Sequence, residues 1–152
     1  MKRILAAIFA LSLFLVLPAP ARAFENDALS ISLPDNWKAV DENSGGNGQY
    51  AFGNADDTAA VIVLVSPVSG YTSKEFAEEA AAKYEGAKAI DNGDGLYRFT
   101  AMGEAHEVRT LAGVFGGQQV LVAVVGSDPD LLSVAASLVI KLKARPDVKN
   151  LF

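Results

Sequence analysis

The chain contains no cysteine and only one histidine among its 152 residues. Without cysteine it can form no disulfide, no thiolate nucleophile and no lipid-modified N-terminal cysteine. A lone imidazole cannot build a multi-histidine metal site, and no G-x-S-x-G motif offers a serine nucleophile. The sequence therefore predicts no catalytic residue, no metal site and no cofactor, and we expect His106 to be an ordinary residue of an edge strand.

Two further ligand-binding motifs are incomplete. The glycine-rich segments at 45–48 and 115–117 do not follow a strand and open a helix, as a phosphate-binding loop requires. Asp91–Gly95 resembles part of a calcium loop but lacks the ligand spacing and the terminal bidentate glutamate. A hairpin turn is favoured there, and Asp56 and Asp57 are interpreted first as turn residues.

Residues 1–23 have the pattern of a secretory signal. A basic start precedes an apolar run from Ile4 to Leu17, a proline breaks the run, and Ala21-Arg22-Ala23 has the small residues of a cleavage site. The run is shorter than the ~20 apolar residues that span a membrane. We expect cleavage before Phe24, no transmembrane span afterwards, and a periplasmic or secreted location. A retained anchor and a buried N-terminal helix are the alternatives.

The charge of the remaining chain excludes one class of partner. Removing Lys2, Arg3 and Arg22 leaves 13 − 3 = 10 basic side chains against 18 acidic ones, a net charge of 10 − 18 = −8. Such a surface repels phosphate backbones and anionic lipid headgroups, so we expect no nucleic-acid binding. We expect one domain over residues 24–145 and a C-terminal tail over residues 146–152.

Apolar segments bounded by turn residues predict the strands. Asn92-Gly93 and Gly116-Gly117 are typical of tight hairpins, because both turns need positive φ angles. The last four strands should therefore form a meander. The expected strands are 28–33, 37–40, 49–53, 58–65, 87–90, 96–101, 105–115 and 118–125.

Helical spacing predicts one helix beginning at Thr72. Thr72 and Glu75 match a capping box, and Gly86 stands where a C-terminal cap is wanted. Glu79 and Lys83 form a favourable i, i+4 pair on the polar face, so the acidic residues there indicate a solvated helix face.

A second helix is predicted to begin at Ser127-Asp128. Pro129 suits a first helical position, and Leu138 and Val139 continue the apolar stripe. Basic residues over Lys141–Arg145 are typical of a helix C-terminus, so we expect the helix to end there.

Two strands determine the expected architecture. In Ala60–Val65 and Val120–Val125 both alternating sets of residues are apolar, so each strand must be covered on both faces. A one-sided sheet does not explain this pattern. We predict an α+β fold, a three-layer α/β/α sandwich with a mostly antiparallel sheet and one helix on each face.

The only tryptophan, Trp37, follows a turn at Pro34–Asn36. An indole at this position can cover the end of a core and bury a large apolar area. A structural role is favoured over stacking on a ligand, because tryptophan is on average highly buried.

Two loops are the candidate partner-binding sites. The polar, glycine-rich loop Asp41–Gly48 and the connection Ser66–Tyr71 border the strong strand Thr58–Val65, and functional contacts concentrate on loops held by a rigid scaffold. Their role as solvated connectors is the alternative. The candidate partner-binding residues are Asp41, Glu42, Asn43, Asn47 and Tyr71.

The order of these motifs resembles the PsbP-like superfamily and, within it, small bacterial DcrB-like proteins. The resemblance covers most of residues 28–143, and its motifs are Leu33-Pro34 with Trp37, Ser73 with Glu75-Phe76, and the closing pattern Ser127 to Lys141. It implies the three-layer sandwich and a non-catalytic extracytoplasmic accessory role. DcrB-like relatives are typically lipoproteins, and this chain departs from them by lacking the lipidated cysteine.

Three functions stay open. The first is an extracytoplasmic protein-interaction module whose partner is an unknown protein of the cell envelope. The second is a small-ligand or lipid carrier with a cavity between sheet and helix, lined by residues such as Tyr84 or Phe99. The third and weakest is an enzyme whose carboxylates converge in a cleft.

Overall fold

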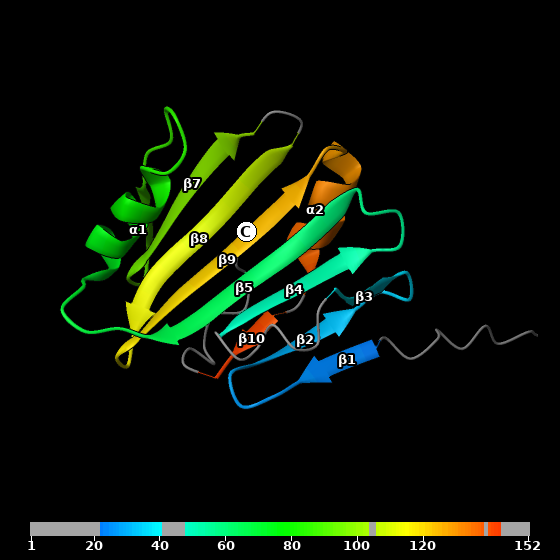
Figure 1. Cartoon of the computed structure of the whole chain (residues 1–152), viewed down its shortest axis with the longest axis horizontal. Coiled ribbons are helices and arrows are strands. Elements are labelled where there is room, and N and C mark those ends of the chain that lie inside the picture. Colours follow the sequence, from blue (N-terminus) through cyan, green and yellow to red (C-terminus); the bar gives the residue numbers. More distant parts are fainter. Residues whose placement is uncertain (1–21, 41–47, 104–105, 139, 144–152) are drawn as a thin grey trace, which may run out of the picture.

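The computed structural model describes residues 22–40, 48–103, 106–138 and 140–143. Within these ranges, ten strands form two antiparallel sheets, and two helices pack on the larger sheet (Figure 1). The strands are β1 (Arg22–Glu25), β2 (Leu29–Leu33), β3 (Trp37–Ala39), β4 (Gln49–Asn54), β5 (Ala59–Pro67), β6 (Ile90–Gly93), β7 (Leu96–Met102), β8 (Glu107–Phe115), β9 (Gln118–Gly126) and β10 (Ile140–Leu142). The helices are α1 (Ser73–Ala81) and α2 (Pro129–Ser137), and neither is long and apolar enough to cross a bilayer.

The larger sheet has seven strands in the order β3-β4-β5-β9-β8-β7-β6. Its centre is the β5–β9 pair, in which Val61 lies opposite Val124 and Val63 opposite Val122. All four valine side chains are buried and point to one face of the sheet. Because side chains alternate along a strand, Ile62 and its neighbours at even positions of β5 point to the other face.

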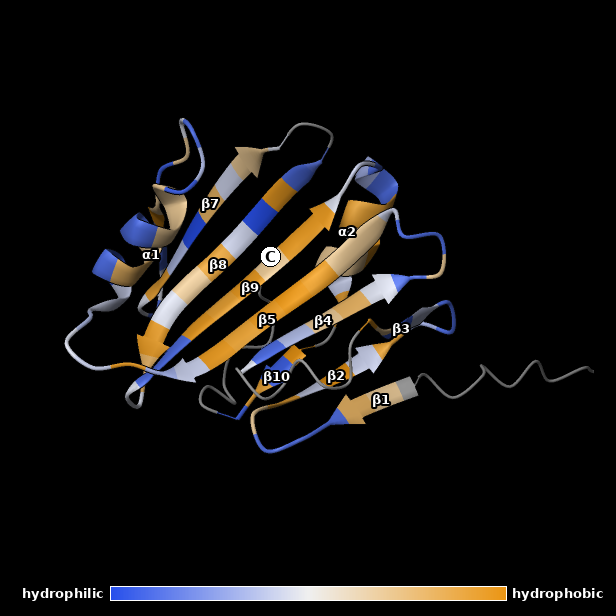
Figure 2. Ribbon diagram, viewed as in Figure 1, coloured by the Kyte–Doolittle hydropathy of each residue, from blue (hydrophilic) through white to orange (hydrophobic). Residues whose placement is uncertain are grey.

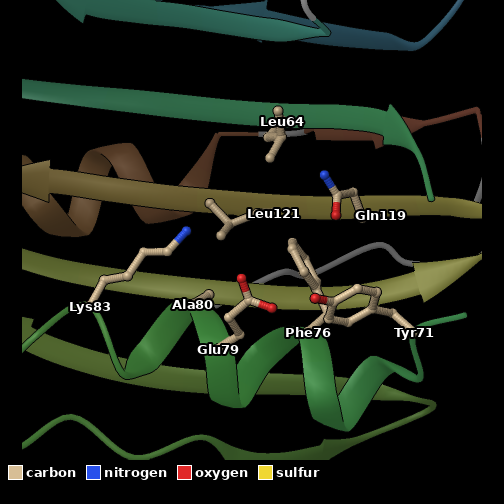
Figure 3. Close-up of a pocket in the computed structure, with 8 residues that line it drawn as sticks. All are labelled: Leu64, Tyr71, Phe76, Glu79, Ala80, Lys83, Gln119 and Leu121. Carbon is tan, nitrogen blue, oxygen red and sulfur yellow. The ribbon is translucent and has the colours of Figure 1, made fainter. Parts of the chain in front are cut away.

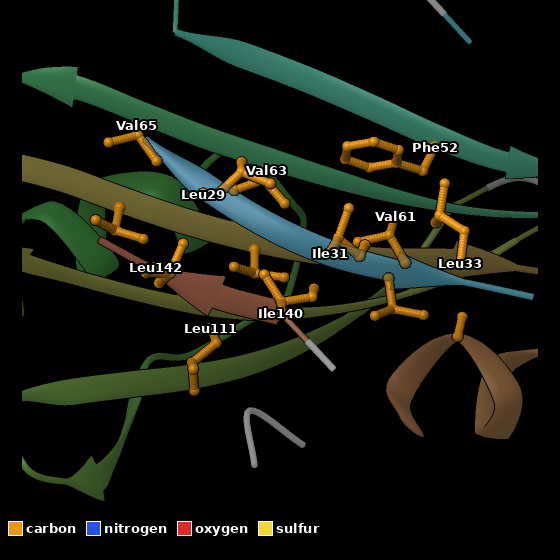
Figure 4. Packing of buried hydrophobic residues seen from close by; sticks show 14 of the residues in the cluster. Leu29, Ile31, Leu33, Phe52, Val61, Val63, Val65, Leu111, Ile140 and Leu142 are labelled. Atoms are coloured by element: carbon orange, nitrogen blue, oxygen red, sulfur yellow. The ribbon is translucent and has the colours of Figure 1, made fainter. Parts of the chain in front are cut away.

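The smaller sheet, in the order β1-β2-β10, covers the first of these faces. Leu29, Ile31, Ile140 and Leu142 from β2 and β10 join the valines of β5 and β9 in one buried cluster (Figure 4). Burying each such side chain stabilises the fold by roughly 1.5–3 kcal/mol. The main core therefore lies between the two sheets.

Trp37 also belongs to this core. It is buried in the main cluster on β3, so the predicted structural role is confirmed. Phe24 of β1 packs on the same core. Its ring makes an edge contact with the Phe52 ring, and the two ring centroids are 5.2 Å apart. The turn residues before Trp37 thus turn the chain from the small sheet into the large one.

Helix α1 packs on the opposite side of the large sheet, over β7 and β8. Its buried residues are Ala77, Ala80 and Ala81, and two of these cluster with Phe99 of β7. The predicted capping box is present, since the Glu75 N–H donates to the Thr72 hydroxyl over 3.2 Å, and the Thr72 N–H donates to the Glu75 carboxylate over 2.8 Å.

Helix α2 packs beside the small sheet, against β9 and β5. The Asp128 carboxylate accepts from the Asp130 N–H over 2.8 Å, and Pro129 occupies the first turn, as predicted. Leu132 lies close over Gly126 of β9, where an added Cβ would meet its Cδ2 at 3.2 Å. A glycine is needed there because the helix approaches the strand closely.

A buried asparagine organises the turn between β4 and β5. The Asn54 side-chain carbonyl accepts from the N–H groups of Thr58 and Ala59 over 2.9 and 3.1 Å, and its amide donates to the Thr58 hydroxyl over 2.8 Å. Asp57 in this turn has a φ of 55°, which fits the predicted turn. These bonds satisfy the only buried polar side chain of the turn.

The α+β class, the antiparallel sheet and the closing meander β6-β7-β8-β9 are confirmed. The cover of the sheet differs from the expected one helix on each face, because the side opposite α1 carries a second sheet as well as α2. Gly116 and Gly117 have φ angles of 57° and 75°, as the predicted hairpin requires. Of the predicted signal over residues 1–23, residues 1–21 lie outside the described residues, whereas Arg22 and Ala23 belong to β1 and pair with β2. The predicted tail at 146–152 also lies outside the described residues.

Several predicted element boundaries are wrong. Helix α2 ends at Ser137, and residues 140–142, assigned to its last turn, form strand β10 paired with β2. Pairing with β2 buries Ile140 and Leu142, which a continued helix would have to place elsewhere. Strand β1 was not predicted, because its residues stand at the end of the signal pattern.

The second group of differences concerns α1 and the strand after it. Helix α1 ends at Ala81 rather than near Gly86, and the Tyr84 N–H then donates to the Ala81 carbonyl over 2.9 Å in a tighter turn. The strand predicted over 87–90 begins only at Ile90 and forms the exposed edge strand β6.

Candidate functional site

A groove of about 220 Å³ runs between α1 and the large sheet (Figure 3). It lies on the face of the sheet that the small sheet does not cover. Its floor is apolar and comes from β5 and β9, while its polar side chains come from α1, from the residues just before and after α1, and from β9. The lining residues are Leu64, Tyr71, Phe76, Glu79, Ala80, Lys83, Gln119 and Leu121.

The groove exists because of the size of the residues under α1. Alanines at 77, 80 and 81 let the helix lie close on β7 and β8, so it does not extend over β5. Ser73 holds the start of the helix to β8, since its hydroxyl accepts from the Val114 N–H over 2.9 Å. Leu64 and Leu121, on the strands beside the helix, are therefore left half-exposed.

Tyr71 enters the groove from the connection before α1. A hydrogen bond from its hydroxyl to the Glu79 carboxylate raises the pKa of Tyr71 above its ordinary value, and the negative charge of Glu79 adds to this rise. Tyr71 is 44% exposed, so its ring edge stays accessible. The pair places a hydroxyl and a carboxylate beside each other in the groove.

The other polar groups of the groove differ in how they are paired. The Gln119 amide donates to the Ser66 hydroxyl over 2.7 Å, across the β5–β9 pair. Lys83 follows the end of α1, and the predicted Glu79–Lys83 ion pair does not form within 4.0 Å; the ion pair on α1 is Lys74–Glu78 at 3.7 Å. Within the described part of the chain, the Lys83 ammonium has no partner. Figure 3 shows it reaching toward Leu121.

Of the predicted partner-binding residues, the structure places Tyr71 in this groove. Asp41, Glu42, Asn43 and Asn47 lie outside the described residues. The base of their loop is described: the Val65 N–H donates to the Gly48 carbonyl over 2.7 Å.

The connection Ser66–Tyr71, at the end of β5, is held at the same end of the sheet as Gly48. The Val68 N–H donates to the Gly117 carbonyl over 2.9 Å, in the hairpin between β8 and β9. Both predicted loops therefore leave the scaffold at one end of β5, next to the groove. The chain thus brings together segments that are separate in the sequence.

The charged groups of the described residues do not form a reactive cluster. No group of three or more histidine, aspartate or glutamate side chains among them could hold a metal ion. His106 is exposed just before β8, and β8 lies between β9 and β7, so the predicted edge-strand position is wrong. The shallow hollow beside His106 is lined by Asp57, Thr58 and the adjoining ends of β5 and β9.

The residues suggested for a carrier cavity pack against each other. The Tyr84 and Phe99 rings are 6.1 Å apart, and Phe99 is buried beneath Ala80 and Ala81. The space between α1 and β7 is therefore filled by side chains at this point. The groove beside Lys83 stays open, and so does a hollow of about 290 Å³ between the end of α1 and residues 87–89.

Sequence reasoning missed Lys83 and Gln119 as groove residues. Lys83 was assigned to a solvated helix face, but it lines the groove together with Glu79, which lies one helical turn before it. Alternation along β9 was a usable signal for Gln119, because it shares a face with Leu121 and lies two residues before it.

Comparison with solved structures identifies the fold. The solution structure of cyanobacterial PsbP from Synechocystis sp. PCC 6803 superposes with a TM-score of 0.54 at 14% identity, covering 81% of this chain and 94% of that one. A crystal structure from Bacteroides thetaiotaomicron VPI-5482 matches with a TM-score of 0.44 at 15% identity, covering 79% of this chain and 48% of that one. No protein family matches the sequence, and no curated protein is similar to it. The chain has a PsbP-like fold.

Proposed function

We propose that this chain is a non-catalytic, extracytoplasmic protein-interaction module that contacts its partner through the end of the large sheet at which β5 finishes. The observation that carries the proposal is the convergence there of exposed Tyr71, the base of the loop over residues 41–47, and the groove beside α1. Loops on a rigid scaffold are where binding residues concentrate.

The fold supports this function, and so does the chemistry of the site. The PsbP-like superfamily, which the sequence resembles, implies an accessory role outside the cytoplasm. The described groove pairs its carboxylate with a tyrosine and leaves an apolar floor exposed, which suits contact with a protein surface. The signal pattern at residues 1–23 and the order of motifs shared with DcrB-like proteins favour a periplasmic or secreted location.

An affinity capture from the cell envelope tests the proposal. The exported protein is immobilised and compared with a variant in which Asn43–Asn47 is replaced by a Gly-Ser linker and Tyr71 by alanine. We expect the parent to capture a specific protein and the variant to lose it while keeping its melting temperature. If the parent captures no specific protein, the interaction function is wrong.

A small-ligand carrier is the second candidate function. The groove favours a carrier that binds its ligand in an open surface groove rather than in an enclosed cavity. Its apolar floor and its unpaired ammonium suit a small amphiphile with an anionic group. Titration of the protein with a fatty acid, followed by fluorescence of Tyr71 and the other tyrosines, would detect such binding. Saturable binding that Lys83→Gln abolishes would favour the carrier over the interaction module.

A further inference from the structure

One face of the large sheet carries an apolar strip that the described residues cover only in part, since Leu121 packs against Ala80 and Ala81 of α1. In Figure 1 β4, β5 and β9 lie in front, with α1 to one side of them and α2 behind. Figure 2 shows that β5 and β9 are the most continuously hydrophobic strands of the sheet. The β5–β9 strip is defined here as their half-exposed residues on this face, together with Ala51 of β4 and the exposed Val40 that follows β3: Val40, Ala51, Ala60, Ile62, Leu64, Leu121 and Val125.

The register places these residues on one surface. Ala51 of β4 lies opposite Ile62 of β5, and Ala60 of β5 lies opposite Val125 of β9, so the apolar surface is continuous from β4 to β9. Val40 is 57% exposed and belongs to the same face, since its Cγ2 lies 3.2 Å from where a Cβ on Gly53 would be. An exposed apolar surface of this continuity marks an interaction site in a soluble domain.

Two lysines flank the strip. Lys38 of β3 lies opposite Gly53 and points to the strip face, because its neighbours Trp37 and Ala39 point into the core side. Lys83 borders the strip from the end of α1. Neither ammonium has an ion-pair partner within the described ranges. At Ala60 and Val125 the strip ends beside the hollow that Asp57 and His106 line.

The dimensions of the strip fit a helix. On β5 the strip runs from Ala60 to Leu64, and a strand rises about 3.3 Å per residue, so the strip is about 13 Å long. A helical segment of about nine residues has the same length, and α1 is a helix of that size. Helix α1 already lies on the neighbouring part of this face, so a second helix beside it would extend the same helix-on-sheet packing.

We propose that the β5–β9 strip docks an amphipathic helix of a partner protein that carries apolar residues on one side and carboxylates at both margins. This inference rests on the proposed function and assigns its partner a chemistry. The apolar side lies on Ile62, Leu64 and Leu121, and the carboxylates pair with Lys38 and Lys83. A second copy of this chain is the other occupant that the tests below distinguish.

A designed peptide provides the probe. It is an amphipathic helix of about 20 residues, with leucines on one face and glutamates at both margins, labelled for fluorescence anisotropy. A sister peptide with lysines in place of the glutamates is the control. We expect the exported protein to bind the glutamate peptide at least about tenfold more tightly than the lysine peptide at low salt.

Variants of the protein test the residues. Lys38→Glu with Lys83→Glu should weaken binding of the glutamate peptide about tenfold, as two rim ion pairs allow. Lys74→Glu with Lys141→Glu makes the same change in net charge on other surfaces and should leave affinity unchanged. Val40→Ser, at an exposed position, should weaken binding without changing the melting temperature.

Other occupants give different results. Equal affinity for both peptides, or an unchanged affinity in the Lys38→Glu, Lys83→Glu variant, overturns the inference. Light scattering that shows a dimer dissociated by Val40→Ser overturns it in favour of a second copy. Tighter peptide binding after removal of residues 144–152 overturns it in favour of the chain's own C-terminal segment.

The envelope capture separates this inference from the proposed function. If the parent captures a specific protein and the Lys38→Glu, Lys83→Glu variant captures it equally well, the strip inference fails while the interaction module stands. If the parent captures no specific protein, the proposed function fails, whatever the peptides do.

Discussion

The Ser73 hydroxyl and the backbone of Val114 form a reciprocal pair of hydrogen bonds across 41 residues of sequence. The hydroxyl accepts from the Val114 N–H over 2.9 Å and donates to the Val114 carbonyl over 3.3 Å. This pair fastens the first residue of α1 to β8 and so sets where the groove opens.

Replacing Ser73 with alanine should therefore destabilise the protein. Both bonds are lost and the half-buried Val114 N–H is left unsatisfied, which costs about 1–3 kcal/mol. Chemical denaturation measures the loss, with Ser133→Ala on the exposed side of α2 as the control. A stability equal to that of the control would mean that water replaces the hydroxyl.

Trp37→Ala should destabilise the protein by about 3–5 kcal/mol. The indole is 1% exposed in the main core, and its removal leaves a cavity that β3 cannot close. The denaturant midpoint should fall, whereas Trp37→Phe should recover part of the loss. A midpoint unchanged in Trp37→Ala would contradict the buried position.

Asn54 should tolerate aspartate better than alanine. Aspartate keeps an acceptor for the N–H groups of Thr58 and Ala59, whereas alanine leaves both without their partner and costs about 2–4 kcal/mol. Thermal unfolding of both variants measures the difference. Equal melting temperatures would show that the side-chain carbonyl does not hold the turn.

Protonation of Glu25 should weaken the link between β1 and the end of β10. The hydrogen bond from Lys143, at 2.6 Å, lowers the pKa of Glu25, and the charge of Lys143 lowers it further. A lowered folded-state pKa adds stability above the unfolded-state pKa, and this stability is lost as the pH falls through the folded-state value. NMR titration should show the Glu25 pKa returning toward its ordinary value in Lys143→Ala.

Cleavage before Phe24 predicts that the exported chain begins with the residue whose ring packs on Phe52. N-terminal sequencing of the exported protein should give Phe-Glu-Asn-Asp. A chain that starts at Met1 would instead show that the apolar segment remains as an anchor.

The success of the sequence-based predictions depended on whether each signal was local. The capping box of Thr72 and Glu75 and the positive φ angles at Gly116 and Gly117 follow from neighbouring residues, and both were predicted. Strand β10 was missed because three residues cannot display a period. Its identity as a strand comes from pairing with β2.

The candidate site shows the same division. Tyr71 was predicted because a connection next to a strong strand is recognisable in the sequence. The groove around it was not, since it depends on how closely the alanines of α1 approach β7 and β8. Lys38 and Lys83 come to flank one strip only through the order of strands in the sheet.

The pairing of β2 with β10 has a consequence for how the molecule is made. Ile31 lies opposite Ile140, so β2, near the beginning of the domain, pairs with a strand that is synthesised near the end of the domain. While the chain is still emerging from a ribosome or a translocation pore, one flank of β2 is unpaired and the core lacks Ile140 and Leu142. Non-local pairing of this kind slows folding, so the unfinished chain keeps an open, apolar surface that a chaperone can hold until the last strand arrives.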